Sequence, residues 1–405
     1  MTETKAPQST FDNEYLQMAL DRCIKCSTCK LSFKEFQKSC PSGENFLFES
    51  FWASGRIRTA RGLLLGDLEW SEEVKDVIFA CPTCGACMDA CQAPHADYIV
   101  DIIESLRELA VQHIGPAENQ EKLVERTVNP ELWNPYGENN SDNSELKEKY
   151  NLPEQAEWVY FIGCTSNYRQ TSLRDATLRF FKKIGLNFTL IDEHCCTSPM
   201  IRTGQTESSE EFMKYNVEQI NKAGASKVIT SCAGCYRTLK KDFEKFGVDY
   251  DFDVFHTAEL VKQLIDEEKI KFTSGFNKTV TYHDPCHLGR HIGIYEIPRE
   301  VYKSIPGIKL VEMRRNRNHS WCCGAGGGVK IGYPEWAVDI SKERISEAQE
   351  TDAEVLSSTC PFCKTNLSDA NEKYNGGFEI IDLIEILDKV GIERLEVEKN
   401  KIRFQ

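Results

Sequence analysis

The sequence predicts an α+β multidomain protein, with a helical N-terminal domain followed by two similar α/β domains. Three observations lead to this fold class. Helical periodicity dominates residues 11–115, short apolar segments alternate with helical ones after residue 155, and one pattern of five cysteines occurs twice in the second half. We therefore expect a helical domain at 1–120, a linker at 121–155, a first α/β domain at 156–275 and a second at 276–405.

Composition sets the class of protein. With 405 residues, the chain is long enough for two or three domains with their own cores. A net charge of −14 argues against a general nucleic-acid or anionic-lipid surface. The start, MTETKAPQST, lacks the features of a secretion signal, and no apolar run reaches the roughly 18 residues of a membrane helix. We expect a cytoplasmic protein that binds no nucleic acid and reaches the inner face of a membrane only through a partner.

The predicted elements follow the same division. YIVDIIESLRELAVQHI at 98–114 has the apolar spacing of a helix, whereas NPYGENNSDNSELKEKYN at 134–151 is polar and typical of a long connection. Apolar strands are predicted within 157–164, 187–191 and 227–235, and again within 278–286, 309–313 and 354–363. Several cysteines directly follow these strands, at the edge where open α/β sheets present ligand sites. We expect two Rossmann-like halves related by pseudo-twofold symmetry, with their cysteine-bearing edges facing each other.

Eighteen cysteines stand out in this composition. In a small secreted chain they would indicate a disulfide framework, but this chain is large and carries no secretion signal. Their spacing argues against random placement, because all of them fall into four groups. The groups are Cys23, Cys26, Cys29 and Cys40; Cys81, Cys84, Cys87 and Cys91; Cys164, Cys195, Cys196, Cys232 and Cys235; and Cys286, Cys322, Cys323, Cys360 and Cys363.

The first two groups each begin with C-x2-C-x2-C. Three thiolates at this spacing can hold three irons of a cubane 4Fe–4S cluster, and in two-cluster ferredoxins the fourth cysteine binds the other cluster. By that logic Cys91 completes the set of Cys23, Cys26 and Cys29, and Cys40 completes the set of Cys81, Cys84 and Cys87. Gln92 stands where the ferredoxin pattern usually has proline. Zinc is the alternative, although it more often takes two plus two cysteines.

The other two groups form an internal repeat, C-x30-CC-x35-C-x2-C and C-x35-CC-x36-C-x2-C. Five thiolates exceed what one cubane takes, so a larger or more open iron–sulfur assembly is indicated, in which neighbouring cysteines serve different irons or one cysteine bridges two. Gly324, which follows the second pair, would let the backbone approach inorganic sulfide closely. Thr197 stands at the equivalent place in the first repeat. Two disulfides and one free thiol per repeat are the alternative.

This repeat resembles the cysteine-rich CCG domain. YHDPCHLGRH, CCGAGGGVK and CPFCKTNLSD resemble the second such domain in the family of heterodisulfide reductase D subunits, and YFIGCT, CCTSPMIRTGQ and CAGCYRTLK resemble the first. The order of two cubane motifs and two CCG domains also matches, so the resemblance covers nearly the whole chain. It implies a helical ferredoxin domain with two cubane clusters. It also implies one noncubane 4Fe–4S cluster on each five-cysteine set, with Gly324 beside the second.

The resemblance also implies an activity. In that family the noncubane clusters flank the disulfide of coenzyme M and coenzyme B, the thiol coenzymes of methanogenesis, and each takes one sulfur as electrons arrive. We accordingly expect an oxidoreductase that acts on sulfur groups. It would pass electrons through two cubane clusters to the noncubane clusters, which reduce or form a disulfide. The candidate catalytic cysteines are Cys195, Cys196, Cys322 and Cys323.

Basic and histidine residues beside the cysteines are further candidates. Basic residues recur at matching offsets in the two repeats, as Arg169 and Arg290, Arg202 and Lys330, and Arg237 and Lys364. They could hold an anionic thiol, such as the sulfonate of coenzyme M or the phosphate of coenzyme B, or be solvated surface charges. His283, His287 and His291 flank Cys286 and are candidate proton donors to a leaving thiolate, with a structural role as the alternative. His194 and Trp321 precede the cysteine pairs and are interpreted as packing residues.

The sequence has no nucleotide or flavin motif, so electrons are expected from a partner. In the family this partner is a membrane-bound b-type cytochrome, or a soluble flavin-containing or hydrogenase module. Two other functions stay open. One is an enzyme of sulfur metabolism that acts on a protein disulfide or trisulfide. The other is a non-catalytic electron-transfer subunit, as in glycolate or glycerol-3-phosphate dehydrogenases. Two complete five-cysteine sets favour catalysis, because a simple relay needs no such sites.

Overall fold

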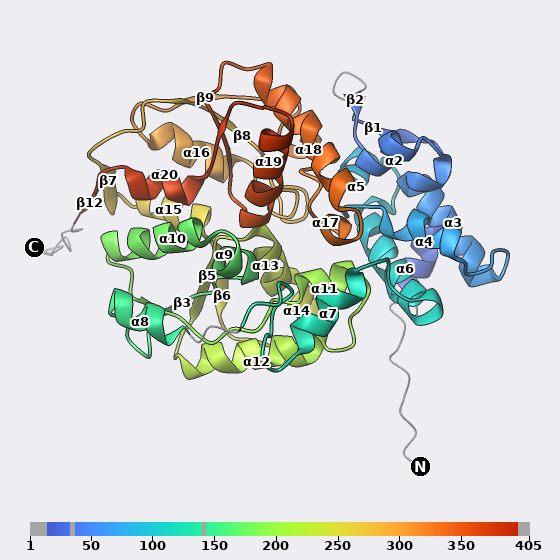
Figure 1. The fold of residues 1–405 in the computed structure, drawn as a ribbon, viewed down its shortest axis with the longest axis horizontal. Helices are drawn as coiled ribbons and strands as arrows, with labels where there is room; N and C mark the ends of the chain where they lie inside the picture. Colours follow the sequence, from blue (N-terminus) through green and yellow to red (C-terminus); the bar gives the residue numbers. More distant parts are fainter. Residues whose placement is uncertain (1–13, 33–36, 140–142, 396–405) are drawn as a thin grey trace, which may run out of the picture.

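The computed structural model describes residues 14–32, 37–139 and 143–395. Residues 1–13, on which the expectation of no secretion signal rests, and 396–405, at the end of the second α/β domain, lie outside the described ranges. Figure 1 shows a helical N-terminal domain (blue) beside two α/β domains, one green to yellow and one orange to red. Within the described ranges, no helix combines the length and apolar character needed to cross a bilayer.

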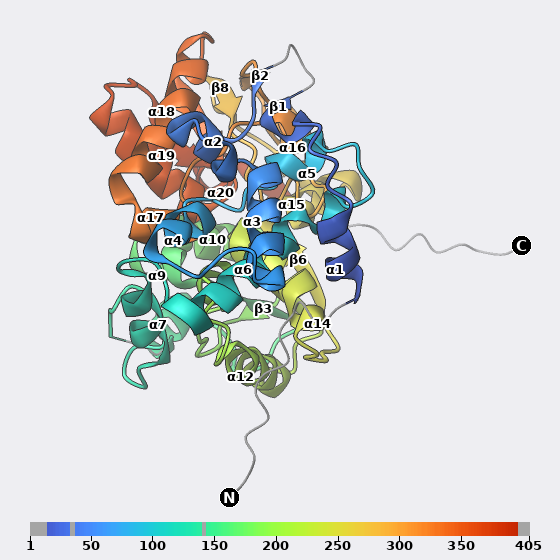
Figure 2. The same ribbon diagram turned by 90° about the vertical axis from the view of Figure 1, so that its right-hand side faces the viewer.

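The N-terminal domain is built from short helices around a small core. Its longest helix, α6, buries Ile99, Ile102, Ile103, Leu106 and Ala110 along one face, as the sequence predicts. Two short strands, β1 (Leu31–Ser32) and β2 (Gln37–Lys38), pair antiparallel. The helices are α1 (Glu14–Asp21), α2 (Pro41–Phe46), α3 (Ala53–Leu65), α4 (Glu72–Phe79), α5 (Ala86–Ala90) and α6 (Ile99–Ile114). Figure 2 shows this domain from its outer side, in front of both α/β domains.

The connection at 121–155 contains structure of its own. Helices α7 (Gln120–Val128) and α8 (Ser144–Tyr150) lie in it, and residues 140–142 between them are outside the described ranges. Helix α7 packs against α11 (Ser198–Arg202) of the first α/β domain and α17 (Val329–Gly332) of the second. The connection therefore contacts both domains rather than only joining them.

The first α/β domain has a four-stranded parallel sheet in the order β4-β3-β5-β6. Its strands are β3 (Trp158–Tyr160), β4 (Phe188–Thr189), β5 (Lys227–Thr230) and β6 (Asp253–His256). Its helices are α9 (Cys164–Tyr168), α10 (Thr171–Lys183), α11 (Ser198–Arg202), α12 (Ser209–Lys222), α13 (Ala233–Arg237), α14 (Phe243–Lys245) and α15 (Thr257–Asp266). The π-helical turn Thr238–Asp242 joins α13 to α14.

The second α/β domain repeats this topology in the order β9-β8-β10-β11. Its parallel strands are β8 (Thr279–Tyr282), β9 (Lys309–Val311), β10 (Val355–Ser358) and β11 (Glu379–Asp382). Its helices are α16 (Glu296–Ser304), α17 (Val329–Gly332), α18 (Pro334–Gln349), α19 (Pro361–Lys373) and α20 (Leu383–Lys389). A separate antiparallel pair, β7 (Ile270–Phe272) with β12 (Ile392–Arg394), joins the start of this region to its end.

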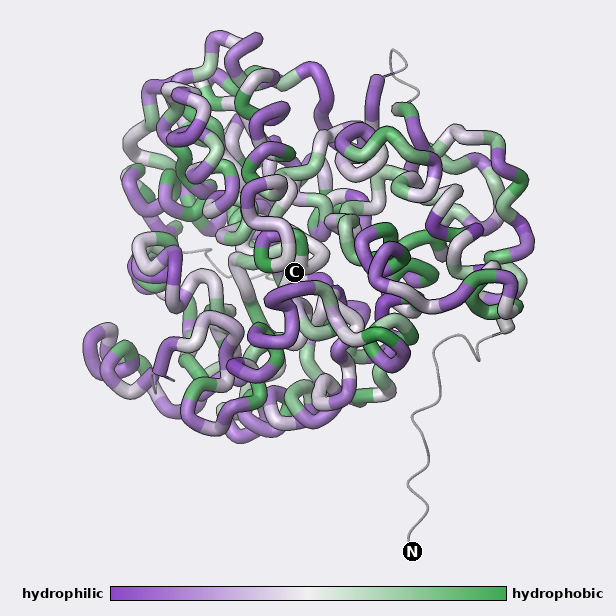
Figure 3. The backbone as a smooth tube through the Cα atoms, turned by 45° about the vertical axis from the view of Figure 1, so that its right-hand side comes forward, coloured by the Kyte–Doolittle hydropathy of each residue, from purple (hydrophilic) through white to green (hydrophobic). Residues whose placement is uncertain are grey.

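The two α/β domains share their core. One buried cluster contains Val159 and Val228 of the first domain together with Met313 and Leu356 of the second. Figure 3 shows hydrophilic stretches along the outer edges of both domains, which fits helices that cover apolar sheets. Because the cores are continuous, the loops at the carboxyl ends of both sheets are held in a fixed relation to each other.

Candidate metal centres

All eighteen cysteines lie in the described ranges, and each is a free thiol. Most of them are buried, including both adjacent pairs. The described residues therefore do not form the two disulfides per repeat that the sequence left open. Buried thiols gathered in groups without disulfides are typical of the donor set of a metal centre.

Cys91 lies with the first C-x2-C-x2-C motif. Cys23, Cys26, Cys29 and Cys91 line one small cavity of about 20 Å³. Burial raises the pKa of Cys91, and the nearby charges of Cys26, Cys29 and Cys23 raise it further. Cys91 is the C-cap of helix α5, which packs against the short helical turn at 28–30, and this contact brings the two segments together. Cys26 is exposed, so this set lies at the surface.

Cys40 lies with the second motif. Burial raises the pKa of Cys40 to about 12. The charge of Arg56 lowers this pKa, whereas the nearby charges of Cys81 and Cys84 raise it further. Burial and repulsion from Cys84, Cys81 and Cys40 also raise the pKa of Cys87 well above its ordinary value. The structure therefore gathers these cysteines in the two crossed sets that the spacing predicts. Their ligation of iron stays a prediction.

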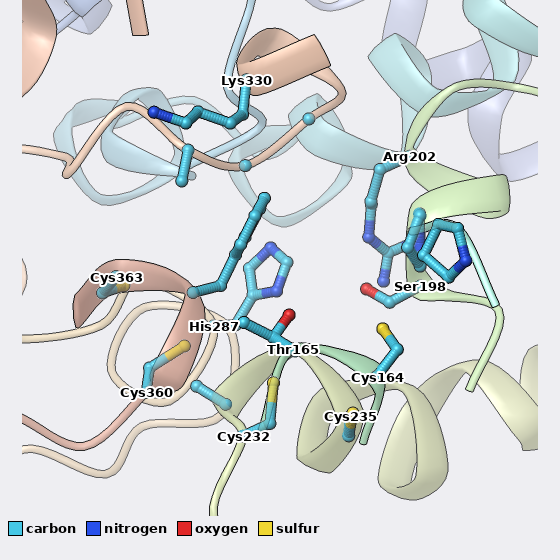
Figure 4. A pocket seen from close by; sticks show the side chains of 18 of the residues that line it. Cys164, Thr165, Ser198, Arg202, Cys232, Cys235, His287, Lys330, Cys360 and Cys363 are labelled. Carbon is cyan, nitrogen blue, oxygen red and sulfur yellow. The ribbon is translucent and has the colours of Figure 1, made fainter. Parts of the chain in front are cut away.

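The two five-cysteine sets meet at one cavity of about 260 Å³ (Figure 4). The loops after strands β3, β5, β8 and β10 carry most of these cysteines to the cavity, at the carboxyl edges of the sheets. Figure 4 shows His287 between Cys360 on one side and Cys164 on the other. The lining cysteines are Cys164, Cys196, Cys232, Cys235, Cys286, Cys323, Cys360 and Cys363.

Within each repeat, three thiols form a hydrogen-bonded triplet. The second cysteine of the adjacent pair is in hydrogen-bond contact with the first and with the last cysteine of the C-x2-C, and these contacts hold its pKa well below the ordinary value. The triplets are Cys195, Cys196 and Cys235, and Cys322, Cys323 and Cys363. The sulfurs of Cys323 and Cys363 are 3.3 Å apart. Thiolates at this spacing repel each other, so a bound cation or metal cluster would stabilise them.

The two repeats touch through their C-x2-C motifs. Cys232 of the first repeat donates a hydrogen bond to Cys360 of the second, which holds the pKa of Cys360 well below its ordinary value. Each cysteine is also the N-cap of the helix that follows it, α13 or α19. The two halves of the site therefore face each other directly.

The glycine-rich loop at 324–328 joins the second repeat to the N-terminal domain. A Cβ on Gly327 would overlap the backbone of Cys81 and Pro82, and one on Gly328 would overlap Gln120 and Thr203. Gly327 has φ 64° and Gly328 φ 73°, values that favour glycine. These glycines therefore let the loop lie against the cysteine segment of the N-terminal domain.

Gly324 and Thr197, which follow the two cysteine pairs, have the same backbone conformation. Gly324 has φ 85° and Thr197 has φ 70°. A Cβ on Gly324 would overlap the carbonyl oxygen of Ala337 and the side chain of Ile340 in α18. Close packing on a helix thus accounts for Gly324, and the predicted approach to sulfide stays untested. Thr197 accepts a left-handed conformation that is costly for a β-branched residue, and its buried hydroxyl has no hydrogen-bond partner among the residues that the structure describes.

The cations predicted near the cysteines already have partners in the protein. Arg202 lines the cavity but pairs with Glu104 at 3.1 Å and also with Asp242. Lys330 lines the cavity and binds Asp369 at 2.5 Å and Asn366 at 2.7 Å. These partners come from other parts of the chain, so the matching offsets could not reveal them.

Three further predicted cations are tied to nearby groups. Arg237 pairs with Glu104 at 3.3 Å, and Lys364 pairs with Glu385 at 2.7 Å. Arg290 donates to the carbonyl oxygens of Cys84 at 3.0 Å, of Asn318 at 2.9 Å and of Ser320. Arg290 therefore holds the cysteine-pair segment of the second repeat against the N-terminal domain.

The histidines have different surroundings. His291 bonds the carbonyl oxygen of Thr83 at 3.0 Å, a structural contact with the N-terminal domain. Burial lowers the pKa of His287 to about 3, so its ring inside the cavity is neutral. His283 is buried beside the thiol of Cys323, and among the described residues neither ring nitrogen has a nitrogen or oxygen partner. His194 stacks between Trp133 and Tyr215, and Trp321 bonds Ile340, which agrees with the predicted packing roles.

Two family models match the chain. The model described as a 4Fe-4S dicluster domain matches residues 19–94, and the model described as a cysteine-rich domain matches 158–240 and 280–368. The D subunit of the dihydromethanophenazine:CoB–CoM heterodisulfide reductase of Methanosarcina barkeri is 38% identical over 391 residues, which cover 91% of this chain and 93% of that protein. The chain belongs to the family of heterodisulfide reductase D subunits. As a member it is an iron–sulfur subunit of an oxidoreductase.

Relatives of this family member extend beyond heterodisulfide reductases. The B subunit of the fumarate reductase (CoM/CoB) of Methanothermobacter marburgensis is 33% identical over 90% of this chain and 71% of its own length. The EtfAB:quinone oxidoreductase of Syntrophomonas wolfei is 30% identical over 83% of this chain and 49% of its own length. A solved structure of a hypothetical protein from Helicobacter pylori has a TM-score of 0.50, with 10% identity over 82% of this chain and 66% of its own; this shows a common fold alone.

The structure of this heterodisulfide reductase homologue also reveals site residues that sequence reasoning missed. Tyr136 and Arg126, from the connection predicted as a linker, line the cavity together with Arg169. The Tyr136 hydroxyl bonds Thr165 at 2.9 Å, and the Arg169 guanidinium lies 4.6 Å from the Tyr136 ring centre. Arg169 also pairs with Glu138 at 2.8 Å. The polar composition of the connection gave no signal for this role.

Arg107 is the second missed residue. It is fully buried in α6, and its guanidinium donates to the carbonyl oxygens of Cys81 at 2.6 Å and Gly327 at 2.7 Å. It also donates to Phe79 at 3.0 Å and to Arg202. One side chain of this heterodisulfide reductase homologue thus ties together the N-terminal cysteine segment, the glycine-rich loop and the first α/β domain. Burial lowers its pKa to about 10, which leaves it charged at neutral pH.

Proposed function

We propose that this chain is the iron–sulfur catalytic subunit of a heterodisulfide reductase-like complex, and that its cavity is where a disulfide is reduced or formed. The overall reaction is R–S–S–R′ + 2 e⁻ + 2 H⁺ to R–SH + R′–SH, or its reverse. One observation carries the proposal: four cysteines of each five-cysteine set line one cavity, all but Cys195 and Cys322, and the two sets touch through Cys232 and Cys360. Coenzyme M–S–S–coenzyme B, named for the heterodisulfide reductase relatives, is the proposed type of substrate.

The residues present fit four clusters. Cys23, Cys26, Cys29 and Cys91 would hold one cubane cluster, and Cys40, Cys81, Cys84 and Cys87 the other; the two five-cysteine sets would hold noncubane clusters. Their thiols are free, mostly buried and grouped, and the two family models match these regions. When bound, the clusters would carry electrons between a partner and the cavity and supply the irons at which a disulfide exchanges two electrons.

The positions of the cysteine sets support a path for electrons from the surface of the N-terminal domain to the cavity. Cys26 is exposed, whereas Cys84 lies against Cys322 of the second repeat. Arg290 donates a hydrogen bond to the carbonyl oxygen of Cys84, and its charge is also close to Cys286 and Cys322. The N-terminal domain would thus connect a partner to the cavity.

We also propose that the two CCG domains are related by pseudo-twofold symmetry. The equal strand orders support this relation. Helix α10 packs against α20, and α15 packs against α16, which are equivalent contacts once the two domains are exchanged. Capping boxes recur at equivalent places, with His256 and Glu259 in one domain and Asp382 and Glu385 in the other. A symmetric frame suits a reaction at two linked sulfurs.

The chain's own residues would orient an anionic disulfide. Arg126 and Arg169 lie at the cavity beside Tyr136, and cations there would attract sulfonate or phosphate groups. The ion pair of Arg169 with Glu138 is partly exposed to solvent, so it offsets the charge of Arg169 less than a buried pair would. Arg202 and Lys330 stay candidates for weaker contacts, because Glu104, Asp242 and Asp369 already balance their charge. Arg290 would position the cysteine-pair segment through its hydrogen bonds to the carbonyl oxygens of Asn318 and Cys84.

The electron partner would dock on the N-terminal domain. Within the described ranges, large hydrophobic side chains that are exposed lie between Met18 and Tyr98, and the most exposed are Ile24 (76%), Phe48 (73%) and Leu47 (72%). Exposed apolar side chains gathered on one domain are typical of a partner surface. We propose a membrane-bound b-type cytochrome, or a soluble flavin or hydrogenase module, which would bring a cytoplasmic chain to a membrane only through that partner.

A second function is a non-catalytic electron-transfer subunit. The similarity to EtfAB:quinone oxidoreductase over 83% of this chain favours it. Under this alternative the cavity would bind no thiol. An enzyme that acts on a protein disulfide or trisulfide would need the same cavity, and its volume of about 260 Å³ favours a small substrate instead.

The deciding experiment uses anaerobic, fully loaded protein oxidised in the presence of coenzyme M or coenzyme B thiol. A paramagnetic signal that requires the thiol supports the proposed function. A thiol without an anionic group is the matched control, because it tests recognition by the cavity cations. If every cluster is intact and neither coenzyme produces a signal, the electron-transfer alternative replaces the catalytic one.

A further inference from the structure

His283 is a buried polar ring whose neighbour is the sulfur of Cys323. It is 1% exposed, and among the described residues neither Nδ1 nor Nε2 has a nitrogen or oxygen partner, while the contact with Cys323 contributes to the lowered pKa of that thiol. A buried imidazole in this state is costly, because the ring lost its bonds to water on folding and gained only a contact with a sulfur. Such a group indicates a partner that binds in its vicinity.

The candidate partner is at the second five-cysteine set. A ring nitrogen of His283 and the sulfurs of Cys323 and Cys363 all lie within 4.8 Å of one another. The backbone of His283 is fixed, because its N–H donates to Ser357 at 2.8 Å as an extension of the sheet. The ring is therefore held beside two sulfurs that are proposed to bind one cluster.

The first repeat has an apolar ring at the equivalent place. Tyr160 bonds the hydroxyl of Ser231 at 3.2 Å, and Tyr282 bonds the hydroxyl of Thr359 at 2.9 Å, which sets the register of the two repeats. Each tyrosine is followed directly by the residue in question, His283 or Phe161.

Phe161 has the same backbone bond as His283. Its N–H donates to Ile229 at 2.9 Å. It is fully buried, in the core cluster that also contains Cys196 and Cys235, the counterparts of Cys323 and Cys363. At this position the second site thus has a polar ring and the first site an apolar one.

We propose that a ring N–H of His283 donates a hydrogen bond to a sulfur of the cluster bound by Cys323 and Cys363, which makes the second site easier to reduce than the first. The inference rests on the proposed function for the presence of that cluster. A neutral imidazole carries one N–H donor, and hydrogen bonds to cluster sulfurs raise the reduction potential. Phe161 offers no such donor to the first site. Two unequal sites suit a disulfide whose two sulfurs belong to different thiols.

The test measures potentials on anaerobic holoprotein without substrate, so that it does not depend on turnover. Two variants address the ring: His283→Phe copies the first repeat, and His283→Gln keeps a donor. Phe161→Leu is the matched control, a buried change at the equivalent place that removes no donor. Iron content is measured for each, followed by a redox titration monitored by electron paramagnetic resonance.

The expected result is a downward shift of one midpoint in His283→Phe, so that the midpoints of the two sites converge, with iron content unchanged. His283→Gln should shift less, and Phe161→Leu should leave the second site unchanged. An unchanged titration of His283→Phe at full iron content overturns the hydrogen bond alone and leaves the proposed function standing. Selective loss of iron in His283→Phe also overturns it, because the ring would then be a ligand. A wild-type iron content of about eight atoms, the content of two cubane clusters, would overturn both proposals.

Discussion

The thiol of Cys322 donates a hydrogen bond to the sulfur of Cys84, across the boundary between the second α/β domain and the N-terminal domain. This bond is the main reason that the pKa of Cys84 falls to about 6. The two cysteines belong to sets proposed for different clusters. Their contact therefore places a cubane set and a noncubane set side by side.

The first prediction is metal content. Anaerobically purified protein should hold about sixteen iron atoms, four for each of four clusters, with little zinc. Atomic emission spectroscopy measures the iron and zinc contents, and a sulfide assay measures the inorganic sulfide of the clusters. About eight irons at full occupancy, or zinc in place of iron, would rule out the noncubane assignment.

Cys23→Ala should separate electron supply from substrate binding. It changes a ligand at the surface set and leaves the cysteines of the cavity in place. Turnover with the natural partner should fall at least about tenfold, because one step of the path is damaged, while the thiol-dependent signal persists. Steady-state assays and spectroscopy on the same sample check this. Partner-driven turnover at the wild-type rate would remove the N-terminal domain from the electron path.

The residues after the cysteine pairs form a matched test. Gly324→Val should lose the second noncubane cluster, because a side chain there would overlap α18 and φ is 85°. Thr197→Gly should keep its cluster and unfold at the same or a higher temperature, since release of a left-handed β-branched residue is worth roughly 1 kcal/mol. Iron counts report whether each variant keeps its cluster, and anaerobic thermal unfolding reports its unfolding temperature. A normal cluster in Gly324→Val would show that α18 yields to the added side chain.

Arg107→Met should destabilise the folded chain by at least about 3 kcal/mol, because it leaves several buried carbonyl oxygens without a donor. Denaturant unfolding under anaerobic conditions measures the change. Arg179→Met is the control, since Arg179 is half exposed and its ion pair with Asp388 should be worth about 1 kcal/mol or less. Equal effects of the two changes would contradict the role of Arg107 as a link between domains.

The buried carboxyl group of Glu104 should make the free energy of unfolding depend on pH. Burial alone would raise its pKa, but the charges of Arg202 and Arg237 lower it to about 2, from an ordinary value of 4.5. The unfolded chain then binds the proton more readily, so this contribution of about 3 kcal/mol is complete above pH 4.5 and is lost as the pH falls toward 2. The difference in unfolding free energy between wild type and Glu104→Gln should therefore shrink as the pH falls below 4.5. A difference that does not vary with pH would show that Glu104 does not carry the effect.

The cysteine sets could be predicted from the sequence because ligands of one centre must lie within reach of each other, and this fixes their spacing along the chain. The strands that precede Cys164, Cys232, Cys286 and Cys360 were also predicted, since each is a short apolar run. Strands β6 and β11 were missed, because DVFH and EIID mix charged and apolar residues over only four positions.

Pairing between distant side chains could not be predicted. The offsets of Arg202 and Lys330 suggested cations available to a substrate, yet Glu104 and Asp369 reach them from other helices. The role of Tyr136 was hidden in the same way, because a polar connection shows no periodicity that would place it at the cavity. Spacing carries information on ligands that share one centre and little on charges that meet only after folding.

The exposure of Cys26 has a consequence for damage by oxygen. An oxidant that diffuses to the protein meets this set first, whereas both adjacent cysteine pairs are buried beneath the domains. Damage by oxygen would therefore begin at the cysteine set that contains Cys26 and reach the buried cysteine pairs later. Protein isolated aerobically would lose its connection to the electron partner before it loses the cavity, and would still bind thiols while its turnover has ceased.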